Sequence, residues 1–410
     1  MPTKYNQNNM NILLYIVCLV TVIIFPFFTG ILFLFFAFFS QGRKSYFFLI
    51  AFCLLCNLIF LDCALGNGAD LERYMQVTRQ MSMVNGLMEF FQFCRQAPIV
   101  SFEKSSYLFL LIQYIVSRTN YFNFLSYISA FLGSFFIFFP FLDSTKNDFF
   151  KRREALILSL LSFFFVGYGV LASTMRWGLA VTSLFFFSYI YFEKAKNTKK
   201  FIWLLFIPLL FHIGIIADVL FVIYASLVKK INIIQIIIPI VVIIIYFANI
   251  KSFNIDSASF LGQINMMSNV YSNNFMANYA TQNSQIEELI QFSACFMIII
   301  YNFLTRSLKI NSNIKVLSII LVFGTFAMFP QQLILQRYLL FLFLILAFNP
   351  VYKNNLFHLR STMNILVIIL LFALTGFNEF VNIYRFNFTL PGFNVMFENV
   401  ISILENMPSL

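Results

Sequence analysis

The chain has 410 residues, of which 60% are hydrophobic and only 10% are charged, and its mean hydropathy is +0.84. This balance excludes a soluble globular protein of this length and indicates a polytopic helical membrane protein. The formal net charge of +11 does not indicate nucleic-acid binding, because the basic residues lie in short segments between apolar runs and are expected to set membrane topology. We therefore expect an all-α bundle of transmembrane helices with no nucleic-acid partner.

The first apolar stretch, residues 11–39, is long for one span and short for two. Pro26 and Gly30 are the positions at which we expect it to break. Because the stretch continues far beyond a signal-peptide core and has no small-residue cleavage site, we expect an uncleaved signal. The predicted total is about 12 or 13 spans.

Basic clusters recur along the chain, and the positive-inside rule places them in the cytoplasm. The apolar runs between them are then predicted to cross the membrane at 46–65, 122–142, 155–172, 177–192, 201–211, 214–228, 231–248, 288–305, 314–329, 338–351 and 364–381. Residues 107–116 are too few to cross and are expected to form a re-entrant or interfacial helix. Residues 1–410 are thus predicted to form one integral membrane domain.

Two sizeable outer loops and an outer tail are predicted. The first loop, residues 66–106, is expected to carry an amphipathic helix over 70–93 that rests on the membrane. The apolar residues available for this contact are Leu71, Met75, Met81, Leu87 and Phe90. The second loop, 249–287, is rich in Asn, Ser, Gln and Met and resembles a flexible lid. The C-terminal tail, 391–410, is expected to lie along the outer surface as a short amphipathic helix.

Lysine and arginine divide between the two predicted faces. Twelve of the seventeen basic residues assigned to the cytoplasm are lysines, whereas seven of the nine assigned outside are arginines. The outer set is Arg73, Arg79, Arg95, Lys104, Arg118, Arg176, Lys251, Arg337 and Arg385. Arginine binds phosphate with a planar fork and tolerates desolvation better than lysine. The sorting indicates an anionic outer ligand such as a diphosphate, and the alternative is chance combined with structural ion pairs to the acidic residues of the first loop.

Arg176 and Arg337 are the most informative of these arginines. Arg176 lies between the predicted spans 155–172 and 177–192, and Arg337 precedes the span 338–351. An arginine within a bilayer span costs about 2.5–3.5 kcal/mol, so such residues are usually functional. Neither has an acidic neighbour in the sequence, and both are therefore candidate ligand-binding groups at the outer surface.

His212 and Asp218 are further candidates near the next predicted outer turn. A neutral imidazole at this turn is suited to act as a base or as a hydrogen-bond donor to a diphosphate, and the alternative is a structural histidine. Asp218, one turn inside the following span, indicates a polar interior or an ion pair with an outer arginine. The chain has no P-loop, no dinucleotide-binding glycine motif and no H-E-x-x-H, so we expect no metal site and no cofactor.

Five short motifs carry a family resemblance. Two lie in the predicted first outer loop and at its end: Gly68-Ala69-Asp70-Leu71-Glu72-Arg73-Tyr74 is similar to G-x-D-x-x-x-Y, and Phe102-Glu103 to Tyr107 is similar to E-x-G-Y but with Ser106 in place of the glycine. Two lie at later predicted outer turns: Met175-Arg176-Trp177-Gly178-Leu179-Ala180 is similar to R-x-x-x-A, and Phe211-His212-Ile213-Gly214 is similar to an F-H turn. The last, Gln336-Arg337-Tyr338, is similar to a late R-Y. In this order, and all on the outer side, they resemble the bacterial O-antigen polymerase (Wzy-type) family, close to the EpsG-type polysaccharide polymerases.

The resemblance implies a metal-independent glycosyl transfer at the periplasmic face of the bacterial inner membrane. The growing chain would move from its undecaprenyl diphosphate onto the non-reducing end of a new lipid-linked repeat, and undecaprenyl diphosphate would leave. The implied partners are the lipid-linked oligosaccharide repeats, the bilayer, a chain-length regulator and a flippase. The alternatives are an O-antigen ligase, which shares the donor, and a lipid-linked oligosaccharide flippase or other transporter.

The resemblance also implies roles for the candidate residues. Arg176 and Arg337 would bind the diphosphate and stabilise its developing charge. His212 would be the base or an orienting donor, with Asp70 or Glu72 as alternative bases. The remaining expected substrate-binding residues are Arg73, Asp70, Tyr74, Tyr338 and Asp218.

Overall fold

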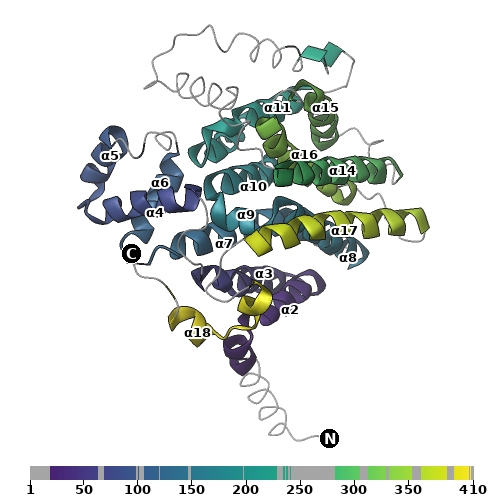
Figure 1. The fold of residues 1–410 in the computed structure, drawn as a ribbon. Coiled ribbons are helices and arrows are strands. Elements are labelled where there is room, and N and C mark those ends of the chain that lie inside the picture. Colours follow the sequence, from purple (N-terminus) through teal and green to yellow (C-terminus); the bar gives the residue numbers. More distant parts are fainter. Residues whose placement is uncertain are drawn as a thin grey trace, which may run out of the picture.

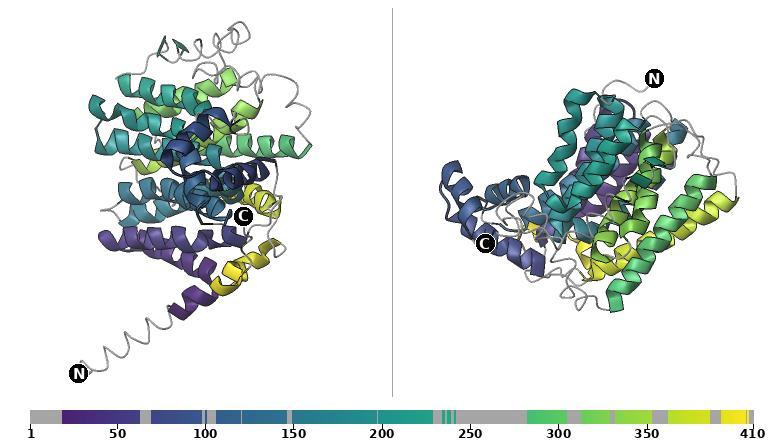
Figure 2. Two further views of the ribbon diagram at one scale, coloured as in Figure 1. Left: turned by 90° about the vertical axis from the view of Figure 1, so that its left-hand side faces the viewer. Right: turned by 90° about the horizontal axis from the view of Figure 1, so that it is seen from above.

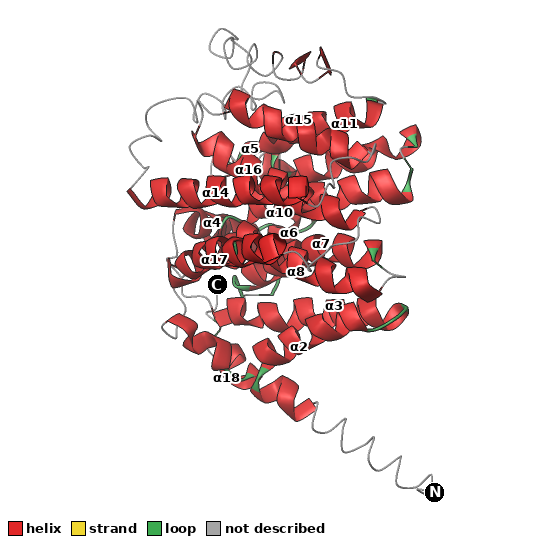
Figure 3. Ribbon diagram, turned by 90° about the vertical axis from the view of Figure 1, so that its right-hand side faces the viewer, coloured by secondary structure: helices red, strands yellow, loops and turns green. Residues whose placement is uncertain are grey.

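The protein is seen here in a computed structural model. The described residues are 19–62, 69–97, 100, 106–119, 121–145, 149–196, 198–228, 234–235, 237–238, 241, 282–304, 313–328, 332–352, 362–385, 392–405 and 407. Within these residues every element is a helix (Figure 3), which confirms the predicted all-α bundle. Most of the predicted second outer loop, 249–287, lies outside the described residues, and its last six residues begin a helix.

The helices of the bundle lie roughly parallel to one another and stack in layers (Figure 1). The N-terminal half contains α2 (Pro26–Phe39), α3 (Arg43–Cys56), η1 (Asn57–Asp62), α4 (Ala69–Ser82), α5 (Leu87–Gln96), α6 (Tyr107–Val116), α7 (Phe124–Ser144), α8 (Phe149–Val166), α9 (Tyr168–Ser173) and α10 (Met175–Tyr189). The C-terminal half contains η3 (Ile190–Lys194), η4 (Lys199–Leu210), η5 (Ile213–Ile215), α11 (Ile216–Leu227), α14 (Gln282–Leu304), α15 (Asn313–Met328), α16 (Gln332–Tyr352), α17 (Thr362–Arg385), η9 (Gly392–Phe397) and α18 (Val400–Glu405). The predicted break in the first apolar stretch occurs just before Pro26, whereas Gly30 lies inside α2.

Three of the described helical stretches are long and apolar enough to cross a membrane, judged by length and composition. They are Arg43–Asp62, Phe124–Ser144 and Met363–Phe380, and they correspond to the predicted spans 46–65, 122–142 and 364–381. Six shorter apolar helices accompany them. The total of about 12 or 13 crossings stays a prediction.

Helix α16 runs through the middle of the bundle. Every residue from Tyr338 to Phe348 is buried, as expected for a helix that is apolar on all sides. The ring of Phe343 stacks on that of Phe165 in α8, with centroids 3.9 Å apart. The side-chain amide of Asn302 in α14 donates to the carbonyl of Leu346 at 2.8 Å. Such close packing and interhelical hydrogen bonds are what hold helices together where lipid replaces water.

The two ends of α10 differ in chemistry. At the C-terminal end, the Tyr189 hydroxyl donates to Asp143, which also forms an ion pair with Lys194. Arg176 lies at the other end. At 1.5 Å per residue, the helix separates Arg176 from Tyr189 by roughly 20 Å. Lys194, assigned to the cytoplasm from the sequence, and Arg176, assigned outside, therefore lie at opposite ends of the bundle.

Helices α4, α5 and α6 form a separate group beside the bundle, seen at the left of Figure 1 and again at the left of the right-hand view in Figure 2. The single helix predicted over 70–93 is wrong, because the chain is broken between Ser82 and Leu87 into α4 and α5. The predicted membrane contact is also wrong for Leu71, Met81 and Phe90, which are buried in the protein. The apolar helix α6 offers a protein partner for this face; Met81, Phe90 and Leu110 share one small core.

Arg118, one of the arginines predicted to lie outside, caps the C-terminal end of α4. Its guanidinium donates to the carbonyls of Met81 and Ser82, each at 3.3 Å, and to that of Val84. It also lies 4.4 Å from the ring centroid of Tyr114 in α6. A cation that satisfies the last carbonyls of a helix is a C-cap, so this arginine has a structural use.

Replacing Arg118 with alanine is therefore expected to loosen the α4–α6 group. Losing charge-assisted hydrogen bonds to these exposed and partly buried carbonyls should cost about 1 kcal/mol of stability. Hydrogen exchange of the α4 amides should be faster in Arg118→Ala, whereas Arg79→Ala, at an exposed arginine of the same helix, serves as the control. Equal protection in both variants would contradict the capping role.

Candidate functional site

Arg176 follows an interrupted helix. Helix α8 ends at Val166, and the next residue, Gly167, has a φ of +90°, which is open to glycine and costly for other residues. The six-residue helix α9 follows, and α10 then starts at Met175. The predicted hairpin of two spans thus contains an additional short helix that the sequence did not predict. Arg176 is the second residue of α10 and is only 6% exposed.

Tyr74 connects Arg176 to the group formed by α4, α5 and α6. The Nε of Arg176 donates to the Tyr74 hydroxyl at 3.0 Å, and its guanidinium lies 5.4 Å from the centroid of the Tyr74 ring. The guanidinium of Arg73 lies 5.3 Å from the same centroid. Phe109 of α6 packs edge-on against Tyr74 at 5.0 Å, and the Gln113 side chain donates to its carbonyl at 3.3 Å. Two arginines therefore share one aromatic ring that α6 holds in place.

Trp177, the residue after Arg176, contacts the other two candidates, Arg337 and His212. The guanidinium of Arg337, from α16, lies 4.9 Å from the centroid of the Trp177 ring. The ring of His212, from the turn between η4 and η5, packs edge-on at 5.0 Å. The indole N–H of Trp177 is buried and has no hydrogen-bond partner among the described residues.

We call Arg73, Arg176, Arg337 and His212, with the rings of Tyr74 and Trp177, the arginine cluster. Its members come from α4, α10, α16 and the turn before η5, elements far apart in the sequence. A guanidinium group over the face of an aromatic ring is attracted to it by a cation–π interaction. Asp70 forms an ion pair with Arg73 at 3.0 Å. Three fixed cations at one end of a membrane bundle are suited to bind an anion.

The protonation of His212 follows from its contacts. Its Nδ1 accepts the backbone N–H of Gly214 at 2.9 Å, so the neutral ring must carry its proton on Nε2. Burial lowers the pKa of His212 well below its usual range, and the positive charges of Arg176, Arg337 and Arg73 lower it further. The imidazole is thus neutral at pH 7 and offers a donor at Nε2. Of the two roles left open by the sequence, donor or base, the geometry favours the donor.

Gly214 is needed beside this histidine. A Cβ atom at this position would lie 2.9 Å from the ring atoms of His212 and 3.3 Å from the Trp177 ring. Both distances are tighter than ordinary van der Waals contact, so a larger residue would displace the rings. The glycine in the Phe211-His212-Ile213-Gly214 motif therefore has a steric reason.

Tyr338 and Asp218, which are also predicted to bind substrate, are both buried. The Tyr338 hydroxyl donates to the carbonyl of Leu321 in α15 at 2.7 Å, because adjacent residues of a helix face different sides and Arg337 takes the side of the cluster. Asp218 is 3% exposed in α11, and its Oδ1 has no hydrogen-bond partner. The ion pair predicted between Asp218 and an outer arginine is absent from the described residues. No three His, Cys, Asp or Glu side chains gather as a metal site in the described stretches.

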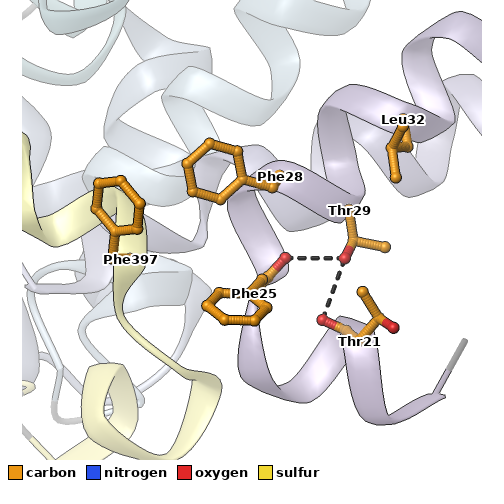
Figure 4. Close-up of a pocket in the computed structure, with 6 residues that line it drawn as sticks. All are labelled: Thr21, Phe25, Phe28, Thr29, Leu32 and Phe397. Carbon is orange, nitrogen blue, oxygen red and sulfur yellow. Dashed lines mark hydrogen bonds between the residues drawn. The ribbon is translucent and has the colours of Figure 1, made fainter. Parts of the chain in front are cut away.

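An apolar pocket of about 260 Å³ lies away from the cluster, between the start of α2 and η9 (Figure 4). Its lining residues are Thr21, Phe25, Phe28, Thr29, Leu32 and Phe397. It shares no residue with the arginine cluster and has no charged side chain. An uncharged, apolar lining offers no cation to a diphosphate.

Trp177 and the supporting residues of Tyr74 were missed as site residues in the sequence. The only signal for Trp177 was its place beside a costly arginine within a motif. Nothing in the sequence indicated that Phe109 and Gln113 would hold Tyr74, since that contact depends on how α6 packs on α4.

Comparison with known proteins gives one match. A family model described as the EpsG family matches residues 45–390, a range that includes every member of the arginine cluster. No curated protein and no solved structure matches the chain.

Proposed function

The chain belongs to the EpsG family and is a membrane protein of the polysaccharide-polymerase kind, and from this premise we propose that it joins oligosaccharide repeats carried on undecaprenyl diphosphate. In this reaction the bond between the anomeric carbon of the donor and its diphosphate oxygen breaks. A new bond forms from that carbon to the non-reducing-end hydroxyl of a second lipid-linked repeat. Undecaprenyl diphosphate leaves, and the acceptor proton passes to a base. The site would face the periplasm of the inner membrane.

The arginine cluster is the observation that carries this proposal. A diphosphate leaving group gains negative charge as the glycosidic bond breaks, and fixed cations stabilise that charge without reorganising. The guanidinium groups of Arg73, Arg176 and Arg337 lie over two aromatic rings, so the cluster is assembled in the protein without substrate. The buried N–H of Trp177 and the Nε2–H of His212 add neutral donors for ligand oxygens.

If His212 acts as a hydrogen-bond donor, a carboxylate must accept the proton of the acceptor hydroxyl. Asp70 and Glu72 of the first outer loop are the two alternatives considered from the sequence. Asp70 is the better placed of the two, because its ion pair with Arg73 brings it next to the cluster. Glu72 is exposed on the same helix. We therefore assign proton acceptance to Asp70.

Reconstitution tests the proposal directly. Purified protein in liposomes is given a lipid-diphosphate-linked repeat, and the products are separated by length. Products longer than one repeat support a polymerase. Transfer seen only after addition of lipid A-core would indicate a ligase, and movement across the membrane without bond formation would indicate a flippase.

Substitution of His212 separates the donor role from the base role. His212→Gln keeps a terminal N–H donor and should hold polymerisation within about tenfold of wild type, whereas His212→Ala should lose about 10- to 100-fold. Because the pKa of His212 is lowered, its protonation needs a pH below the usual value of about 6.5. The rate should thus show no histidine step between about pH 6.5 and 8. If His212→Gln is as inactive as His212→Ala, and the rate of the wild-type protein shows a titration step in that pH range, His212 acts as a base instead.

A further inference from the structure

Glu379 is a carboxylate buried in a helix of the bundle that the proposed reaction does not use. It is 5% exposed and lies in α17, within the candidate span Met363–Phe380. Ionisable residues inside a membrane span are costly and generally have a function. The hydrogen-bond partners of Glu379 are backbone groups, which indicates that it holds part of the chain.

The part that it holds is the break between α8 and α9. Its Oε2 accepts the N–H of Tyr168 at 2.7 Å, and the N–H of Gly169 also bonds to this carboxylate. The neighbouring Asn378 donates to the carbonyl of Phe165 at 3.4 Å. Helix α17 therefore bonds both sides of Gly167, where the helical hydrogen bonds are interrupted. A broken helix at membrane depth requires such partners for its freed backbone groups.

Helix α9 is in turn rigidly connected to the start of α10. The N–H of Thr174 donates to the carbonyl of Val170 at 3.0 Å, and the N–H of Trp177 donates to the carbonyl of Thr174 at 3.0 Å. Leu171 packs directly on Gly178, where an added Cβ would lie 3.2 Å from its side chain. A rotation of α9 would therefore turn the first residues of α10 with it.

We infer that Glu379 is a positioning residue for the arginine cluster: it fixes α9, and through α9 it sets the directions of Arg176 and Trp177. Its effect on catalysis rests on the proposed function, whereas its effect on the geometry of Trp177 does not. The inference can therefore be tested with and without substrate.

Tryptophan fluorescence gives the test without substrate. The chain has two tryptophans, and Trp203 in η4 is 56% exposed, so Trp203→Phe leaves Trp177 as the sole reporter. In that background, Glu379→Ala should shift the emission of Trp177 to longer wavelength, because its contacts with Arg337 and His212 loosen. Glu379→Gln retains an acceptor oxygen and should restore emission close to wild type.

Asn302→Ala is the matched control. It removes buried interhelical hydrogen bonds between α14 and α16 without touching α9, so it should lower thermal stability but leave Trp177 emission unchanged. If Glu379→Ala does not fold, Glu379→Asp keeps a carboxyl group on a side chain one methylene shorter and should shift emission in the same direction. Wild-type emission from every folded Glu379 variant, or an equal shift from Asn302→Ala, would overturn the inference.

Activity gives the second readout. A misplacement of about 1 Å is expected to cost on the order of 100-fold, so kcat should fall at least about tenfold in Glu379→Ala with a smaller change in KM. Glu379→Gln should recover to within about threefold of wild type. If wild-type protein forms no polymer while Glu379→Ala still shifts Trp177 emission, the proposed function fails and the positioning role stands.

Discussion

Replacing Arg176 with alanine is expected to end polymerisation while the bundle stays folded and inserted. The residue is buried at the centre of the arginine cluster, where it bonds to the Tyr74 hydroxyl. Removing one fixed donor from a site of developing charge typically costs about 10²–10³-fold in kcat. In cells, surface glycan should then carry single repeats instead of long chains, as shown by gel separation of the polysaccharide.

Two further variants make this result specific. Arg176→Lys retains the charge but loses the planar fork and the Nε bond to Tyr74, so its activity should lie between alanine and wild type. Arg79→Ala removes an exposed outer arginine of α4 and should leave chain length unchanged. A wild-type chain-length distribution in Arg176→Ala would eliminate this residue from the mechanism, and full activity in Arg176→Lys would reduce its role to simple charge.

The double substitution of Arg176 and Arg337 is expected to be strongly non-additive. The two arginines meet at neighbouring positions of α10: Arg176 belongs to that helix, and the guanidinium of Arg337 lies over the ring of the next residue, Trp177. If both hold one diphosphate, either single alanine variant should lose about 10²–10³-fold. The double variant should then lose little more, because residues that act as a unit do not contribute independently.

The measurement is a double-mutant cycle on kcat in the reconstituted assay, with product length as the readout. Arg337→Lys is the companion variant, since it keeps the charge but loses the stacking of a planar group on Trp177. Losses that multiply across the cycle would show that the two arginines act at separate sites, and the single-diphosphate proposal would then be wrong.

The sequence predicted the individual helices better than their partners. The bounds predicted for the short helix, 107–116, are those of α6, and the predicted span 122–142 differs from α7 by two residues at each end. Apolar runs bounded by charges are local features, so they can be read one segment at a time. The helix predicted over 70–93 failed for the opposite reason: its apolar face packs on α6, a partner that local pattern does not reveal.

The same distinction applies to the arginines. Counting charges between apolar runs predicts their placement on one side of the membrane. It does not predict their individual uses, because Arg118 caps α4 whereas Arg337 lies over the ring of Trp177. Both uses depend on contacts with residues at least 34 positions away in the chain.

The sequence by itself determined that this is an all-helical membrane protein, and it predicted which of its charges share a face. The hydrophobicity of each segment and the charges that flank it govern its insertion into the membrane, and both can be read from the sequence. The tertiary structure decided which arginines meet, that His212 is a donor at Nε2, and that Glu379 clamps the break at Gly167. Each of these depends on the direction of a side chain or a backbone group, and direction is set only when helices distant in sequence pack together.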